Sequence, residues 1–93
     1  MQIGIKNKRE IIVTNAQTAK AMESGSVSVF ATPAMVAMME NVCEQSVSQE
    51  LLKEGKGSVG TKLDIKHIAA TPVGMKVRFE SQLIKIDGRV LTF

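Results

Sequence analysis

Three polar side chains in this sequence could carry acid–base or nucleophilic chemistry: Thr32, Glu40 and His67. Glu40 is the first charged residue after the apolar run 34–39. A carboxylate in apolar surroundings has a raised pKa, because desolvation disfavours its charged form. Such a group can take a proton from water or attack a carbonyl. The structural alternative is a buried Glu bound by backbone donors, or one that reaches solvent.

The other two candidates have equally simple structural alternatives. His67 is the only histidine, and its imidazole can act as a base, hold a substrate oxygen, or be a core side chain with one hydrogen bond. Thr32 is predicted to be a helix N-cap, followed by Pro33 at the first helical position. Its hydroxyl proton remains free to donate to a ligand, and the helix N-terminus favours a developing oxyanion.

These residues must be positioned by a long helix and the chain that follows it. The helix is predicted to begin at Thr32 and to continue through Glu54, where Gly55 supplies a left-handed closing residue. About 22 residues give a helix of roughly 33 Å. Its first half, 34–39, is apolar on every side and is expected to be buried all round. The second half keeps an apolar stripe that includes Cys43, which is expected to be an inert core thiol.

The remaining elements are predicted to be mainly strands. Residues 58–69 alternate, with His67 on the same face as Leu63 and Ile65, which is typical of a half-buried strand. Before the long helix, the sequence also predicts a short strand at 10–13 and a turn or two of helix within 15–22. After residue 69 it predicts a turn at 71–74 and a long strand at 75–86 with a bulge near 81–82. A hairpin turn at Asp87-Gly88 is expected to lead into a third strand at 89–93.

Composition predicts one small domain over residues 1–93. At 44% apolar and 23% charged residues, this is ordinary globular composition, and no apolar run approaches the roughly 20 residues of a membrane span. One cysteine excludes an internal disulfide, and one Cys with one His cannot complete a structural zinc site. A chain this short is therefore expected to oligomerise, as a reduced, cytoplasmic protein. A net charge of +3 and three aromatic residues disfavour nucleic-acid binding.

Three sequence blocks indicate which protein family the chain resembles. They are Phe30-Ala-Thr-Pro-Ala-Met-Val-Ala-Met-Met-Glu40, Gly57-Ser-Val-Gly-Thr61 and Lys66-His-Ile-Ala-Ala-Thr-Pro-Val-Gly74. Together they resemble the fluoroacetyl-CoA thioesterase-like family over nearly the whole chain. The resemblance implies an α+β hotdog fold, with a central helix wrapped by an antiparallel sheet. It also implies a catalytic Thr, Glu and His at Thr32, Glu40 and His67, which hydrolyse acyl-CoA without metal or organic cofactor at a homodimer interface.

The resemblance also sets expectations that the sequence leaves open. The family continues beyond Phe93 with further strand, so the domain is expected to be incomplete at its C-terminus. The aromatic lid of the fluoroacetyl-specific member has no clear counterpart, since Phe30 is the only aromatic residue before Thr32. Assembly beyond the dimer, to a tetramer, also stays open. The alternatives to a thioesterase are a non-catalytic acyl-CoA-binding module and a dehydratase of the same fold.

Helix geometry adds an independent constraint on the site. Thr32 and Glu40 are eight residues apart, which is about 12 Å along a helix axis. They cannot touch while both lie on one straight helix. The hypothesis we favour is a site that combines residues from two subunits of a symmetric dimer.

Overall fold

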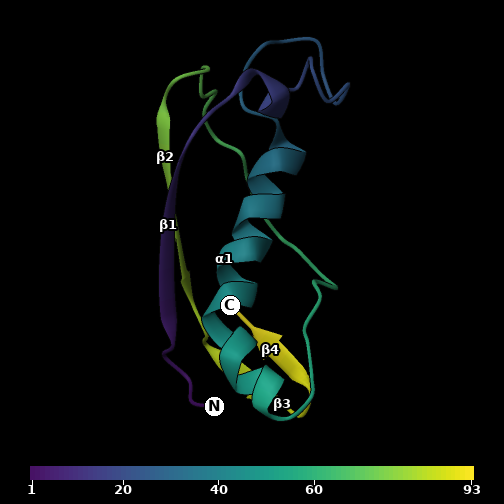
Figure 1. Ribbon diagram of the computed structural model, residues 1–93. Helices are drawn as coiled ribbons and strands as arrows, with labels where there is room; N and C mark the ends of the chain where they lie inside the picture. Colours follow the sequence, from purple (N-terminus) through teal and green to yellow (C-terminus); the bar gives the residue numbers. More distant parts are fainter.

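One long helix is flanked by two antiparallel strand pairs in the computed structural model, which describes residues 1–93 (Figure 1). The elements are β1 (Lys6–Ile12), the 3-10 helix η1 (Asn15–Gln17), α1 (Thr32–Lys53), β2 (Lys76–Gln82), β3 (Lys85–Asp87) and β4 (Val90–Thr92). The predicted α+β class is confirmed. No helix combines the length and the apolar content that a membrane crossing requires.

The pairing of β1 with β2 forms the sheet against which the helix packs. The two strands are antiparallel over seven residues each, from Lys6 opposite Gln82 to Ile12 opposite Lys76. The strand predicted at 10–13 therefore begins four residues earlier. Its first half is polar, and only pairing with β2 identifies it as strand. Val13 continues the contact, because its N–H donates to the carbonyl of Met75 at 3.0 Å.

The core lies between α1 and this sheet. Its buried members come from the helix, its entry, β2 and the residue that follows β1: Val13, Phe30, Ala31, Ala34, Val42 and Phe79. The expectation that residues 34–39 are buried all round is wrong, since Ala37 is exposed and Val36 only half-buried. Figure 1 shows the reason: β1 and β2 cover one side of α1, and the opposite side is flanked only by the chain that follows the helix.

The end of α1 has the geometry that its sequence predicts. Gly55 has a left-handed φ of +68°, which a side chain would strain. Its N–H donates to Leu52 at 3.0 Å, and the N–H of Lys56 donates to Leu51 at 2.9 Å. These two bonds form a Schellman motif, which satisfies carbonyls at the helix end.

The predicted strand at 58–69 is wrong. Residues 57–70 belong to no strand and take part in no backbone–backbone hydrogen bond. A strand requires a neighbour to complete its ladder, and here β1 pairs with β2 and β3 with β4. The alternation survives only locally: Ile65 and His67 are half-buried, while Lys66 is exposed. We call residues 57–70 the return segment, because they run back alongside α1 (Figure 1).

The long strand predicted at 75–86 is split into β2 and β3. Leu83 donates its N–H to Ile5, beside β1, whereas Ile84 donates to Thr92 of β4, both at 2.8 Å. The interruption therefore lies just after the predicted bulge, where the strand changes partners. The predicted hairpin is confirmed, but its turn lies one residue later than predicted: Asp87 belongs to β3 and pairs with Val90, so Gly88, with a φ of +59°, and Arg89 form the turn.

Candidate functional site

Thr32 occupies the first helical position and not the N-cap that its type predicts. The N-cap is Ala31, whose backbone is extended (φ −71°, ψ 138°). Two bonds fix this extended entry: Phe30 donates its N–H to Thr71, and Ala31 donates to Gln17, both at 2.8 Å. The helix consequently begins one residue earlier than a Thr32 N-cap would require. No side chain caps it, so the Thr32 hydroxyl is free for another partner.

That partner is His67. The Oγ1 of Thr32 lies 2.7 Å from the Nδ1 of His67. Either atom can supply the proton, depending on the imidazole tautomer. The rings of His67 and Phe30 also pack in a T-shaped arrangement, with centroids 6.5 Å apart and an interplanar angle of 79°. Because Phe30 is buried in the core, this contact connects the imidazole to the packed part of the molecule.

The Thr32–His67 pair lines a mostly apolar hollow of about 320 Å³. Six of its ten lining residues are apolar, and they come from the loop before α1 and from the return segment: Ala19, Val29, Phe30, Ile68, Ala69 and Ala70. A few polar groups in apolar surroundings are typical of a small-molecule site. The hollow can accept an acyl group while its polar edge offers a hydroxyl and an imidazole.

Glu40 lies apart from this pair. It is not among the residues that line the hollow, and its carboxylate instead lies against Gly60 of the return segment. Thr32 and Glu40 are separated by eight residues of one continuous helix, which places their backbones about 12 Å apart along its axis. Within one chain, the structure thus brings together two of the three predicted residues.

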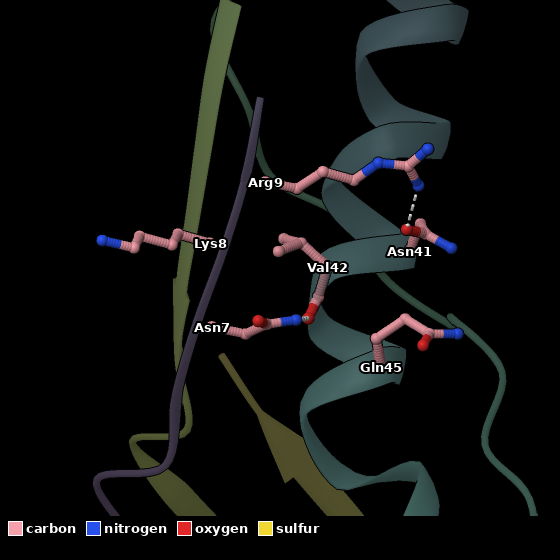
Figure 2. A pocket seen from close by; sticks show the side chains of 6 residues that line it. All are labelled: Asn7, Lys8, Arg9, Asn41, Val42 and Gln45. Carbon is pink, nitrogen blue, oxygen red and sulfur yellow. Dashed lines mark hydrogen bonds between the residues drawn. The ribbon is translucent and has the colours of Figure 1, made fainter. Parts of the chain in front are cut away.

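A second, larger hollow of about 450 Å³ lies between β1 and α1 and is polar (Figure 2). Arg9 donates from Nη1 to the Oδ1 of Asn41 at 2.6 Å, and Asn7 donates from Nδ2 to the carbonyl of Val42 at 3.1 Å. Figure 2 shows Lys8 pointing away from the helix. Residue types and spacing in the sequence do not predict a site at these residues. The feature that could identify them in the sequence is the amide of Asn7 at a half-buried strand position. Their hydrogen bonds attach the sheet to the helix.

Near Glu40, the thiol of Cys43 has a shifted pKa. Burial raises the pKa of its thiol, a hydrogen bond with Ser81 lowers it, and the charge of Glu40 raises it further. The net direction is upward, so the thiol stays protonated and weakly nucleophilic near neutral pH. The structure contains no cluster of three or more His, Cys, Asp or Glu side chains that could hold a metal ion.

Comparisons with known proteins agree with this architecture. The profile of the fluoroacetyl-CoA-specific thioesterase family matches residues 13–93. The fluoroacetyl-CoA thioesterase of Streptantibioticus cattleyicolor is 31% identical over 99 residues, which cover 100% of this chain and 70% of that protein.

Solved structures give the same result. The structure of the fluoroacetyl-CoA thioesterase FlK superposes with a TM-score of 0.89 at 31% identity, covering 98% of this chain and 71% of that one. A mutant of FlK in complex with fluoroacetate and CoA also gives 0.89 at 31% identity, covering 98% of this chain and 77% of that one. The predicted hotdog fold and the predicted family resemblance are confirmed.

Proposed function

The chain belongs to the fluoroacetyl-CoA-specific thioesterase family of hydrolases that act on acyl-CoA, and we propose that it hydrolyses a short acyl-CoA thioester to the free acid and CoA. The observation that carries this proposal is the 2.7 Å approach of the Thr32 hydroxyl to the His67 imidazole at an apolar hollow. The thioesterase relative aligns with the whole chain. This similarity favours catalysis over the alternative of a non-catalytic acyl-CoA-binding module.

Thr32 is the nucleophile and His67 is its base. A hydroxyl and an imidazole at hydrogen-bond distance are a typical activated nucleophile. The Nδ1 of His67 accepts the hydroxyl proton as the Thr32 oxygen attacks the thioester carbonyl. The C–S bond breaks, and the imidazolium returns the proton to the departing thiolate of CoA. The unpaired N–H groups in the first turn of α1 favour the oxyanion that forms.

Hydrolysis of the acyl-Thr32 ester completes the cycle and assigns a role to Glu40. The Glu40 carboxylate takes a proton from the attacking water. The C–O bond of the ester breaks, and the proton passes through His67 to the Thr32 oxygen. Because Thr32 and Glu40 lie about 12 Å apart along one helix, the Glu40 that serves this step comes from a second copy of the chain.

A symmetric homodimer is therefore part of the proposal. The surface beside α1 suits such an interface, since the return segment exposes three large apolar side chains: Val59 (85%), Leu63 (47%) and Ile68 (90%). Exposed apolar side chains on an unpaired segment favour association with another chain. We also propose a cytoplasmic setting, with which the single free thiol of Cys43 is consistent.

The pair is tested with Thr32→Val and His67→Ala. Thiol release from acetyl-CoA and other short acyl-CoA thioesters is expected to fall by about 10²–10⁴-fold in each variant. The isosteric change Glu40→Gln is expected to remove most turnover as well. Binding of the CoA ester is expected to persist in that variant, because the carboxylate that Glu40→Gln removes acts on the water and not on the bound ester. Full turnover in any of the three variants contradicts the assigned role, and full turnover in all three overturns the proposed site.

Mixing two inactive variants tests the shared site. Random pairing of Thr32→Val with Glu40→Gln subunits makes half of all dimers mixed, and each mixed dimer holds one intact site. About a quarter of wild-type activity is then expected after co-refolding at equal amounts. Within-chain sites give no such recovery, because every site carries a lesion. No recovery would contradict the two-subunit arrangement and leave the Thr32–His67 pair unaffected.

A further inference from the structure

Gly60 lies directly against the carboxylate of Glu40. A Cβ atom added at Gly60 would overlap the Oε2 of Glu40, and it would lie 3.0 Å from the Cδ and 3.7 Å from the Cγ of the same side chain. The three heavy atoms nearest to that position all belong to Glu40. The space that a side chain would need at this position is therefore occupied by one acid.

The backbone itself does not require glycine here. Four glycines have positive φ angles, namely Gly4, Gly55, Gly74 and Gly88, and Gly60 is not among them. Alanine could adopt the backbone conformation of Gly60 without strain. Gly57, three residues earlier in the same segment, also lacks a positive φ and has no atom within 4 Å of its Cβ position. The close approach to Glu40 is thus the feature that distinguishes Gly60.

The contact also fixes the path of the return segment. Its single hydrogen bond to the rest of the chain is that between His67 and Thr32, and it forms no ion pair. The Gly60–Glu40 and His67–Thr32 contacts are thus two points at which the segment meets α1. Seven residues of extended chain span about 23 Å, and the eight helical residues between Thr32 and Glu40 span about 12 Å. The segment therefore bows between the two points, as Figure 1 shows.

We infer that Gly60 is a positioning residue for Glu40. Its lack of a side chain lets the return segment press on the acid and hold the carboxylate in the orientation from which it activates water. This inference rests on the proposed function, in which Glu40 acts on the deacylating water. A side chain at position 60 displaces the carboxylate, and a displacement of about 1 Å can cost about 10²-fold in rate.

The test compares Gly60→Ala with its matched control Gly57→Ala, using acetyl-CoA and other short acyl-CoA thioesters. Gly60→Ala is expected to lower kcat by roughly 10–100-fold, with little change in KM or in thermal midpoint. Gly57→Ala is expected to leave all three unchanged. In a Glu40→Gln background, Gly60→Ala is expected to cause no further loss of kcat, because two residues that act through one group are not additive.

Four outcomes overturn the inference. Unchanged kcat in Gly60→Ala shows that the carboxylate does not depend on this contact. An equal loss in Gly57→Ala, or a lowered thermal midpoint that parallels the lost activity, assigns the effect to the segment as a whole. A further loss in the Glu40→Gln background shows that Gly60 acts on another group. Full activity of the single Glu40→Gln variant contradicts instead the role that the proposed function gives to the acid.

Discussion

The candidate site joins two regions of opposite character. Thr32 and Glu40 lie on α1, whose inner face packs on β1 and β2 and buries Ala34 and Val42. The residues that meet them, His67 and Gly60, lie on the return segment, which has no backbone hydrogen bond to the rest of the chain. One half of the site is held by a core and a ladder, and the other by a few side-chain contacts.

This difference shows which half of the site is held least by contacts within the chain, namely the half on the return segment. The peptide groups of the return segment bond to no other part of the chain, while large apolar side chains beside them are exposed. Unpaired backbone with apolar neighbours readily accepts another strand. The distance between Thr32 and His67 is set within one chain, but its rigidity depends on what covers the return segment.

Hydrogen exchange measures this contrast and has the largest expected effect. Amides of α1, β1 and β2 are expected to exchange at least about 10³-fold more slowly than those of residues 57–70 at low protein concentration, because only the former open through loss of core packing. Exchange rates are read by mass spectrometry or NMR on the unmodified protein.

Repeating the measurement over a range of protein concentration sharpens the comparison. Protection of residues 57–70 that grows with concentration assigns their backbone partners to a second copy. If residues 57–70 are as protected as α1 at the lowest concentration, the segment is ordered within a single chain. That result would contradict the contrast between the two regions.

The next largest effect comes from paired truncations in the two regions. Phe30 is buried and touches both Phe79 and His67 edge-to-face. Phe30→Ala is expected to lower the free energy of unfolding by about 3–5 kcal/mol, through lost burial and the cavity left behind. Val59 is 85% exposed, so Val59→Ala should change that free energy by less than about 0.5 kcal/mol. Urea unfolding at low protein concentration measures both.

The control for this pair is the same experiment at high concentration. If Val59→Ala lowers the free energy of unfolding only at high concentration, the return segment forms an interface with another chain. A loss in Val59→Ala comparable to that in Phe30→Ala at low concentration would contradict the division into a packed and an open region.

The parts of the fold that follow from local chemistry were predictable from the sequence. Thr32-Pro33 and Gly55 mark the two ends of α1, and Asp87-Gly88 marks the hairpin, because caps and turns depend on a few neighbouring residues. The helix start was displaced by one residue, since bonds from Phe30 and Ala31 to distant carbonyls fix the entry. The local sequence around the helix start does not show that these distant carbonyls will accept the bonds.

Features that depend on distant partners were not predictable. The first half of β1 is polar and becomes strand only by pairing with β2. The alternating segment at 58–69 has the pattern of a strand but lacks a neighbour in this chain. For the site, the residue types Thr32, Glu40 and His67 could be chosen from chemistry and family resemblance. The sequence indicated neither the Thr32–His67 hydrogen bond nor the contact of Glu40 with Gly60.

The smallest expected effect probes the packed region through Cys43, on the side of α1 that meets β2. Burial raises the pKa of this thiol, Ser81 lowers it by a hydrogen bond, and the charge of Glu40 raises it again. A raised pKa means that the folded protein keeps the proton to higher pH than the unfolded chain does. The resulting stabilisation is complete below the pKa of the unfolded chain and is lost as pH rises through that of the folded protein.

Two measurements check this expectation. The pH midpoint of the reaction of Cys43 with iodoacetamide should be higher in the folded protein than in denaturant, where the thiol returns to its ordinary pKa. The free energy of unfolding should fall as pH rises through this region, and a Cys43→Ala variant should lack that part of the fall. Because Glu40 contributes to the shift, Glu40→Gln should move the midpoint slightly downward. A midpoint equal to that of the denatured chain would mean that water reaches the thiol, and that α1 and β2 pack less tightly than their contrast with the return segment requires.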